Sequence, residues 1–412
     1  MQDKNGKQSI VSAVKAAADS VADRVCEIRQ DIHTHPELRY QEHRTAALCA
    51  AELDRLGIEV RTGVGGTGVV GVLRGKSSNG GTTVALRAEM DGLPMEDRCG
   101  APYQSVNPGV AHLCGHDGHV AAVLGAAFVL AGLRDRLSGN VKFLFEPAEE
   151  ATPEGEIPGA AAMINDGALD TPEPDAVYGA HFYPDWPAGS IALRSGPVFT
   201  GNDRVKLTVI GKESHSAVPH NGVDALLVAS HVVSGLQSLA AQFDIGEALS
   251  MHFSTVHGGR APNLIAERVD LEGTFRISDQ VLRKEMPERV RQMVKGICEA
   301  FGASFSLDYQ LFATRPVVST TREVEIAAKA VEEVLGPEHL IWMRHPKLAA
   351  DTMNNWLERT PGAFFMVGTA NENPSTQFPS HHQKFDIAPE TWPAVVAAES
   401  MIAVRYLEQG AE

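Results

Sequence analysis

The sequence predicts an α/β protein of two domains, the first built on a mostly parallel sheet and the second a smaller α+β layer. At 412 residues the chain is too long for one ordinary hydrophobic core. Short apolar strands alternate with helical patterns in the N-terminal part, which is typical of a parallel sheet. In the middle of the chain the order becomes strand, helix, strand, strand, helix, strand, which favours a small sheet with two helices on one face.

The N-terminal elements follow from hydrophobic spacing. Apolar side chains at helical intervals predict a helix over residues 8–31 and another over 45–56, and strands are predicted near Val60 and over 69–73. Next come a strand within TTVALRAEMD, a strand at the start of VKFLFEPAEE, a helix over 117–133 and a strand that reaches His181. Together these segments predict the parallel core.

Glycines at positions 63–68 spell GVGGTG, which fits the dinucleotide fingerprint GxGxxG. That fingerprint requires a helix directly after it, so that the helix N-terminus meets the pyrophosphate. The residues that follow, VVGVLRG, have the pattern of a strand. We therefore interpret the glycines as a hairpin turn and expect no nicotinamide or flavin cofactor.

The second domain is predicted to interrupt the first. It begins near residue 197 and ends near 314, so that 1–196 and 315–412 form the first domain. Its predicted strands and helices are, in chain order, a strand over 204–210, a helix over 223–241, strands over 250–257 and 268–277, a helix over 280–301 and a strand over 304–312.

Charge and composition exclude several classes of partner. The formal net charge of −16 argues against nucleic acid and anionic membranes, because phosphate binding needs basic patches. No stretch approaches the roughly 20 apolar residues of a transmembrane helix, and the N-terminus lacks the apolar core of a signal peptide. We therefore expect a cytoplasmic protein that acts on a small molecule. Its five scattered cysteines argue against a disulfide framework.

The segment AHLCGHDGHV carries the strongest chemical signal. It packs Cys114, His116, Asp117 and His119 into six positions just before an apolar helical run. A thiolate and an imidazole two residues apart can bind one divalent ion from a tight turn, and the thiolate narrows the choice toward zinc-like ions.

Further ligands must come from elsewhere in the chain. Glu149 and Glu150 follow one predicted strand, His181 ends another, and His381 and His382 lie in a loop near the C-terminus. Each of these alone is more often a structural or solvated group. Because they recur at the ends of predicted strands, together they favour one metal site.

A second group of polar residues lies at the end of the first predicted helix. His33, His35 and Glu37 are close in sequence, which is compatible with metal binding. A turn ordered by Pro36 and local hydrogen bonds explains them better. We therefore expect a structural role for them.

Successive segments of the chain resemble the blocks of the M20 metallopeptidase and amidohydrolase family, in the family's order. The segments run from about residue 32 to about 386 and read ALRAEMDGLP, AHLCGHDGHVAAVLGAA, FEPAEE, GAHFYP, GKESHSAVPH, APNLIAERVDLEGTFR, TPGAFFMVG and HHQKFD. The branch they resemble contains hippurate hydrolases, N-acyl-amino-acid amidohydrolases and auxin-conjugate hydrolases. The resemblance implies a metal-dependent exopeptidase-like catalytic domain with an inserted lid and dimerisation domain.

The resemblance also implies the metal ligands. Cys114, His116, Glu150, His181 and His381 fall at the family's ligand positions. They would hold one or two divalent ions per subunit, Mn²⁺, Zn²⁺ or Co²⁺. Two ions require a bridging ligand, for which the family implies Cys114; a single occupied site stays open. An open position would bind water, whose pKa the metal lowers toward neutrality.

Other site residues follow in the same way. Glu149 falls at the position of the family's general base, and Asp91 and Asp117 are candidates to orient a ligand histidine. His215 corresponds to a histidine that reaches into the partner subunit's site and stabilises the oxyanion. Two further matches contact substrate in the family, namely Asn263 and Arg276, whose planar guanidinium suits a carboxylate.

The chain also departs from the family. Asp351, Thr352 and Met353 replace its usual EDF pattern, Glu146 replaces the glutamine of FQPAEE, and Glu89 replaces the first acid of RADMD. These changes leave the ligands and the base intact but alter their surroundings. Hydrolysis is therefore expected, and the family's standard substrates are not assured.

We predict a divalent-metal-dependent hydrolase that cleaves a C–N bond in a small carboxylate-bearing substrate, an N-acyl amino acid or an aryl amide conjugate. Nothing marks an extended peptide groove, so a general peptidase is not expected. One alternative, from the same family, is an aminohydrolase that releases ammonia from an electron-poor aromatic amine such as 5-nitroanthranilate, in aromatic compound catabolism. The other is a catalytically inactive M20-like binding protein. The inserted domain predicts a homodimer or higher homo-oligomer.

Overall fold

A computed structural model of the chain describes residues 2–76, 81–150, 156–243 and 249–409, which fall into two compact units. The first comprises Met1–Gly196, Val318–Met343 and Asn355–Glu412, and the second comprises Pro197–Val317 and Arg344–Asn354. Residues 344–354, which we expected in the first domain, group with the second unit. Within that unit Lys347 N donates to Val198 O at 2.9 Å, and Thr200 Oγ1 donates to Ala349 O at 3.0 Å.

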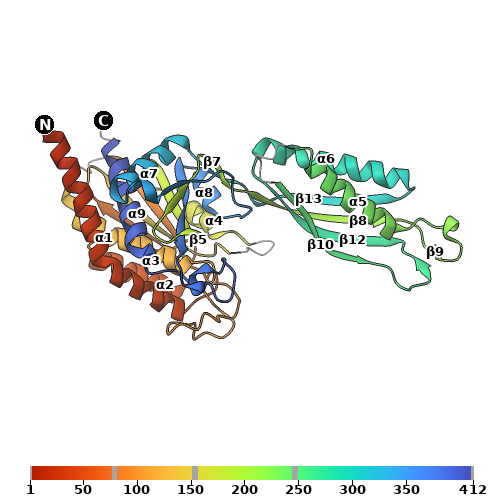
Figure 1. The fold of residues 1–412 in the computed structure, drawn as a ribbon, viewed down its shortest axis with the longest axis horizontal. Helices are drawn as coiled ribbons and strands as arrows, with labels where there is room; N and C mark the ends of the chain where they lie inside the picture. The colour runs from red at the N-terminus through yellow and green to blue at the C-terminus, as the bar shows by residue number, and fades with distance from the viewer. Residues whose placement is uncertain (1, 77–80, 151–155, 244–248, 410–412) are drawn as a thin grey trace. The chain divides into compact units, whose positions relative to one another are not determined.

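The first unit is built on an eight-stranded sheet of mixed direction (Figure 1). Its strands are, in spatial order, β1 (Glu59–Val64), β2 (Gly68–Arg74), β4 (Asn140–Glu146), β3 (Thr83–Glu89), β5 (Ala176–Pro187), β16 (Gly362–Ala370), β6 (Ile191–Leu193) and β15 (Leu340–Trp342). The four central strands β4, β3, β5 and β16 run parallel to their neighbours within that group. The expected α/β architecture with a mainly parallel sheet is confirmed. A separate pair joins β7 (Gly196–Phe199) to β14 (Val317–Ser319).

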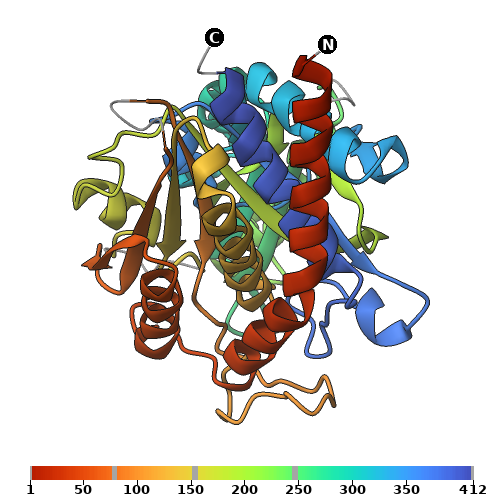
Figure 2. The ribbon, with the colours of Figure 1, turned by 90° about the vertical axis from the view of Figure 1, so that its left-hand side faces the viewer.

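Two long helices, α3 (His116–Gly132) and α9 (Thr391–Gln409), pack against this sheet. A third, α1 (Gln2–Thr34), packs against both of these helices (Figure 2). α3 is apolar around most of its circumference because α1, α9 and the sheet enclose it. The other helices of this unit are α2 (His43–Arg55), α4 (Gly159–Asn165) and α7 (Thr321–Val334), while α8 (Met353–Leu357) spans the boundary at Asn355. No helix in the described ranges is long and apolar enough to cross a membrane.

The carboxyl ends of the parallel strands position the candidate site, as is usual in open α/β sheets. β3 ends at Glu89, β4 ends at Glu146, and β5 carries His181 beside Met366 of β16. The turn before α3 depends on Gly115, whose φ of 97° lies in the left-handed region that glycine tolerates best.

The glycine-rich segment at 63–68 is a hairpin turn, as expected. β1 and β2 pair antiparallel around it, with Val64 opposite Gly68. No helix follows these glycines, because β2 begins at Gly68. The segment therefore lacks the geometry of a dinucleotide fingerprint.

The second unit contains the six elements expected from the sequence. Its antiparallel sheet has the order β10 (Leu249–Gly258), β12 (Arg268–Ile277), β8 (Gly201–Ile210) and β13 (Ser304–Thr314). Helices α5 (Ala225–Ala240) and α6 (Gln280–Ala300) share one apolar core with this sheet. Short strands β9 (Ser214–His215) and β11 (Leu264–Ile265) pair with each other separately.

Candidate metal centre

Cys114 and His116 lie on either side of Gly115 at the start of α3, and both are buried. His116 Nδ1 donates to the backbone oxygen of Asp91 at 2.9 Å and approaches Asp91 Oδ1 at 3.1 Å. This contact directs the other ring nitrogen toward two carboxylates, since His116 Nε2 lies 3.9 Å from Glu149 Oε2 and 4.0 Å from Glu150 Oε1. His116 Nε2 is buried without a hydrogen-bond partner among the described residues.

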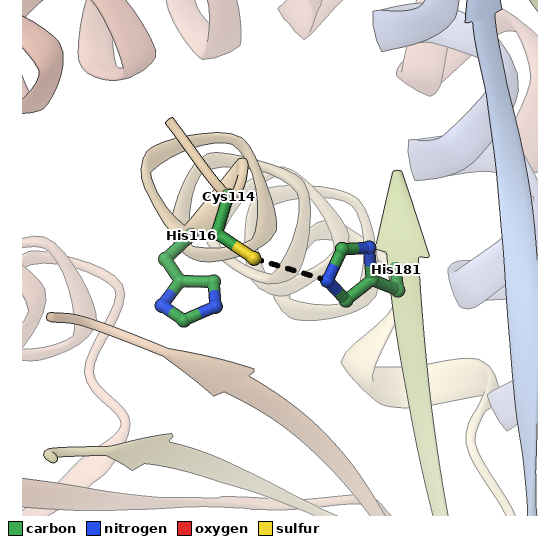
Figure 3. A group of neighbouring side chains, drawn as sticks. All are labelled: Cys114, His116 and His181. Carbon is green, nitrogen blue, oxygen red and sulfur yellow. Dashed lines mark hydrogen bonds between the residues drawn. The ribbon is translucent and has the colours of Figure 1, made fainter. Parts of the chain in front are cut away.

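Two further histidines approach the Cys114 sulfur. The Sγ atom lies 3.4 Å from Nε2 of His181 and 3.2 Å from Nε2 of His381. Figure 3 shows that the rings of His116 and His181 lie on different sides of the sulfur. His381 has a φ of 65°, and its backbone nitrogen donates to Leu113 O at 2.7 Å. That bond fixes the C-terminal loop directly beside the Cys114 turn.

The two glutamates complete the cluster after β4. Ala148 has a φ of 49°, which turns the chain sharply before them. Glu150 N donates to Asp91 Oδ2 at 2.9 Å, and Glu150 Oε1 lies 3.4 Å from His381 Nε2. Asp91 therefore contacts His116 with one carboxylate oxygen and supports Glu150 with the other. The structure thus brings all five expected ligand positions, and Glu149, into one cluster.

The cluster fits a divalent cation. Donor atoms of Cys114, His116 and His181 all lie within 4.8 Å of one another, as do those of Cys114, Glu150 and His381. Burial lowers the pKa of His181, which keeps that imidazole neutral as a ligand must be. Burial also raises the pKa of the Cys114 thiol, and nearby Glu150 adds to this. A cation reverses that preference, because a coordinating thiol is deprotonated.

Residues 85–403 match peptidase family M20/M25/M40. The chain belongs to this family. The resemblance seen in the sequence is thereby confirmed, and the protein is a metal-dependent hydrolase.

Individual M20 relatives cover most of the chain. Thermostable carboxypeptidase 1 of Saccharolobus solfataricus is 33% identical over 399 residues, which are 96% of this chain and 99% of the relative. N-acyl-L-amino acid amidohydrolase of Geobacillus stearothermophilus is 36% identical over 307 residues, 74% of this chain and 80% of the relative. The crystal structure of the Bacillus subtilis YXEP protein, described as a dinuclear metal-binding peptidase of the M20 family, has a TM-score of 0.80 and 27% identity, and the match covers 95% of this chain and 99% of that one.

A buried chain of charged groups lies behind His181 of this M20 hydrolase. His119 Nδ1 donates to Glu89 Oε2 at 2.7 Å, and His119 Nε2 accepts from Phe182 N at 3.3 Å. The Arg87 guanidinium bonds the carboxylate of Glu89 and continues to Glu146, whose Oε2 accepts from Arg87 Nε at 2.7 Å. Trp356 Nε1 donates to the same Glu146 oxygen at 2.7 Å. The sequence shows His119 only as part of the AHLCGHDGHV motif, and this network was not predicted. Charged Arg87 and Glu89 within a predicted apolar strand were a signal of it.

A second buried network involves α1. Asp117, which was expected to orient a ligand histidine, contacts Arg29 and His33 of this helix instead. His33 Nε2 also approaches Asp97 Oδ2 at 3.2 Å. The reason for the difference is that Asp117 faces α1 in the layer of packed helices. Arg29 was missed, although its i, i+4 spacing with His33 beside an apolar face could have indicated it. Glu37 serves a local role as expected, since it accepts hydrogen bonds from the first turn of α2.

The second unit separates the three residues expected to contact substrate. His215 is exposed, and Asn263 lies close to it because β9 pairs with β11 and Ser216 N donates to Asn263 O at 3.0 Å. β12 begins at Arg268, close in sequence to β11, and Arg276 lies near its other end, where it pairs with Asn202. Eight residue steps separate Arg268 from Arg276, roughly 26 Å in an extended strand. Figure 1 shows β9 beyond the end of the sheet at which β12 begins, away from the Arg276 end.

Proposed function

We propose that this M20 hydrolase is an amidohydrolase that cleaves the C–N bond of an N-acyl amino acid or an aryl amide conjugate. The observation that carries the proposal is the cluster of donor atoms from Cys114, His116 and His181. In this cluster His116 Nε2 is buried and has no hydrogen-bond partner in the described part of the chain. Sulfur, imidazole and carboxylate donors suit Mn²⁺, Zn²⁺ or Co²⁺, with Glu150 and His381 completing the ligand set. The names of the amidohydrolase and carboxypeptidase relatives support a substrate that ends in an amino acid.

The proposed reaction assigns a separate task to each group. A divalent ion held by this ligand set would lower the pKa of a water molecule toward neutrality. The Glu149 carboxylate, which faces His116 Nε2 at 3.9 Å, would accept a proton from the attacking water and pass it to the departing nitrogen. His215 donates a hydrogen bond to the oxyanion that develops on the carbonyl, and Arg276 with Asn263 binds the substrate carboxylate.

We further propose that each active site is shared between two subunits. His215 and Asn263 lie together near the start of β12. Arg276 lies near the end of that strand, roughly 26 Å from Arg268. A small substrate cannot touch both ends of one inserted domain. If all three residues contact it, His215 and Asn263 come from the partner subunit of a homodimer or higher homo-oligomer.

A product assay tests the proposal and its competitors. The protein, loaded with Mn²⁺, Zn²⁺ or Co²⁺, is incubated with a panel of acyl amino acids, aryl amide conjugates and aromatic amines such as 5-nitroanthranilate. We expect an acyl fragment and a free amino acid in equal amounts. Ammonia released from an aromatic amine without an acid fragment would instead establish the aminohydrolase, and binding without turnover of any compound would favour the inactive binding protein.

A further inference from the structure

We infer that Arg29 is a positioning residue that holds together two of the ligand-bearing segments of the metal centre, an inference that rests on the proposed function. Arg29 lies in α1 and is 2% exposed. Its Nε donates to Asp117 Oδ2 at 2.8 Å, and its Nη1 donates to Asp386 Oδ1 at 2.8 Å. One guanidinium therefore bonds two carboxylates that are far apart in the sequence.

Those carboxylates belong to two of the segments that carry ligand positions. Asp117 directly follows His116 in the first turn of α3, and Asp386 lies five residues after His381 in the C-terminal loop. The segments meet at the sulfur of Cys114, 3.2 Å from His381 Nε2. Only the correct relative placement of the loop and the turn brings these donor atoms within reach of one ion. The Arg29 fork links the backbones that carry them.

Neighbouring groups hold each carboxylate in place. Tyr103 OH donates to Asp386 Oδ2 at 2.8 Å, and the Arg29 guanidinium lies 5.0 Å from the centre of the Tyr103 ring. His33 Nδ1 donates to Asp117 Oδ2 at 2.7 Å. Buried charges need such pairing. Within the described residues, Arg29 Nη2 and Asp117 Oδ1 are buried without a hydrogen-bond partner, so the pairing rests on the contacts named here. A lysine keeps the charge but cannot reproduce the planar fork, so Arg29→Lys separates charge from geometry.

The expected consequence is a change in metal binding. When the fork is lost, the loop that carries His381 loses one of its links to the turn that carries Cys114 and His116, while the backbone hydrogen bond from His381 to Leu113 remains. The ligands must then be ordered at the expense of binding free energy. Groups that orient metal ligands typically change metal affinity by roughly 10- to 100-fold when they are replaced. Arg29 itself does not touch the substrate, so its effect arises through the ligands.

The experiment titrates Co²⁺ into metal-free wild-type protein and variants, and follows the thiolate-to-cobalt absorption band. The matched control is Arg405→Lys, because Arg405 is 5% exposed and its guanidinium bonds Glu333 and Glu408 at 2.5 Å, away from the ligand segments. We expect Arg29→Lys to weaken Co²⁺ affinity roughly 10- to 100-fold and to alter the band. Arg405→Lys should change Co²⁺ affinity less than about 2-fold, even if its urea unfolding midpoint falls as much as that of Arg29→Lys.

The outcomes separate this inference from the proposed function. If the wild type binds no Co²⁺, the proposed function fails. If the wild type binds it and folded Arg29→Lys binds with equal affinity and the same band, only the positioning role is overturned. Should Arg29→Lys not fold, Asp386→Asn and Tyr103→Phe decide the matter, because each weakens the same link. We expect weaker Co²⁺ binding in both, and wild-type affinity in both would overturn the role.

Discussion

Glu149 and Glu150 are neighbours in the sequence, yet their surroundings differ. Glu150 is held by Asp91 through its backbone nitrogen and faces His381, while Glu149 faces His116. Burial alone would raise the pKa of Glu150, but the hydrogen bond from His381 and the charge of His116 lower it overall. This keeps the Glu150 carboxylate ionised, as a ligand requires.

We predict that the two glutamates fail in different ways when they are changed. Glu149→Gln removes the proposed proton acceptor and should lower kcat by about 10²- to 10⁴-fold, with Co²⁺ affinity close to that of the wild type. Glu150→Gln should weaken Co²⁺ binding itself. Steady-state kinetics and Co²⁺ titration of both variants check this. A Glu149→Gln variant with wild-type kcat would remove Glu149 from the mechanism.

His33 links a buried charge to stability. Burial and the charge of Arg29 act to lower the pKa of His33, but Asp117 and Asp97 outweigh them and raise it to about 10, from an ordinary value of 6.5. The folded state thus binds this proton more tightly than the unfolded state. The stability that His33 contributes is complete below pH 6.5 and is lost as the pH rises through 10.

We therefore predict that His33→Gln costs most at low pH, on the order of a few kcal/mol near pH 6, and progressively less toward pH 10. Urea unfolding of both proteins across this range measures the difference. Burial lowers the pKa of Lys142 to about 8, so this residue makes the free energy of unfolding rise with pH. That effect is common to wild type and variant, so it cancels in their difference. A constant difference between the two proteins at all pH values would contradict the prediction.

Among single residues, the sequence revealed the candidate metal ligands but not the side chains that hold them in place. Cys114 and His116 were identified from spacing alone, because two ligands in one tight turn leave a local pattern. The contact of Arg29 with Asp386 joins residues 357 positions apart, and no local pattern encodes it. Periodicity can show that a charged residue lies near a buried face, but only the packed helices determine which carboxylate it meets.

Among the helices, α1 and α9 both approach α3 closely at Gly125. A Cβ atom there would lie 2.5 Å from Val396 Cγ2 and 2.7 Å from Val25 Cγ2. In α3 an alanine would otherwise be favoured by about 1 kcal/mol over glycine. The contacts are buried and β-branched valines have few rotamers, so the steric cost should exceed that gain.

We predict that Gly125→Ala lowers the free energy of unfolding by about 1 to 3 kcal/mol. The matched control is Gly132→Ala in the same helix, where no atom lies within 4 Å of an added Cβ. That variant should be neutral or slightly more stable. Urea denaturation compares them, and equal stability of the two variants would show that the helices yield at Gly125.

Helices and strands were the most predictable part of the fold. The strand predicted over 268–277 matches β12, and the helix predicted over 280–301 nearly matches α6, because long amphipathic patterns survive in the folded chain. Residues 344–354 were not predictable as part of the second unit, because their attachment depends on backbone bonds to Val198 and Thr200. Backbone pairing over such a distance carries no side-chain signature.

At the scale of the whole molecule, the proposed sharing of sites gives a direct prediction. His215→Ala and Glu149→Ala are each expected to be inactive, but their defects lie in different units of the fold. After dissociation and reassociation, mixed dimers should contain one complete site, with roughly a quarter of wild-type activity if the subunits mix at random. No recovery, despite proven subunit exchange, would place His215 in its own subunit's site or outside catalysis.

On the proposed function, the cluster around Cys114 holds the metal on which hydrolysis depends. The most direct measurement follows the hydrolysis of an N-acyl amino acid while Mn²⁺, Zn²⁺ or Co²⁺ is added stepwise to metal-free protein. We predict no turnover without metal and a rate that rises and then levels off at one or two equivalents per chain. Undiminished turnover in metal-free protein, or failure to bind any of these ions, would contradict the proposed function of this cluster.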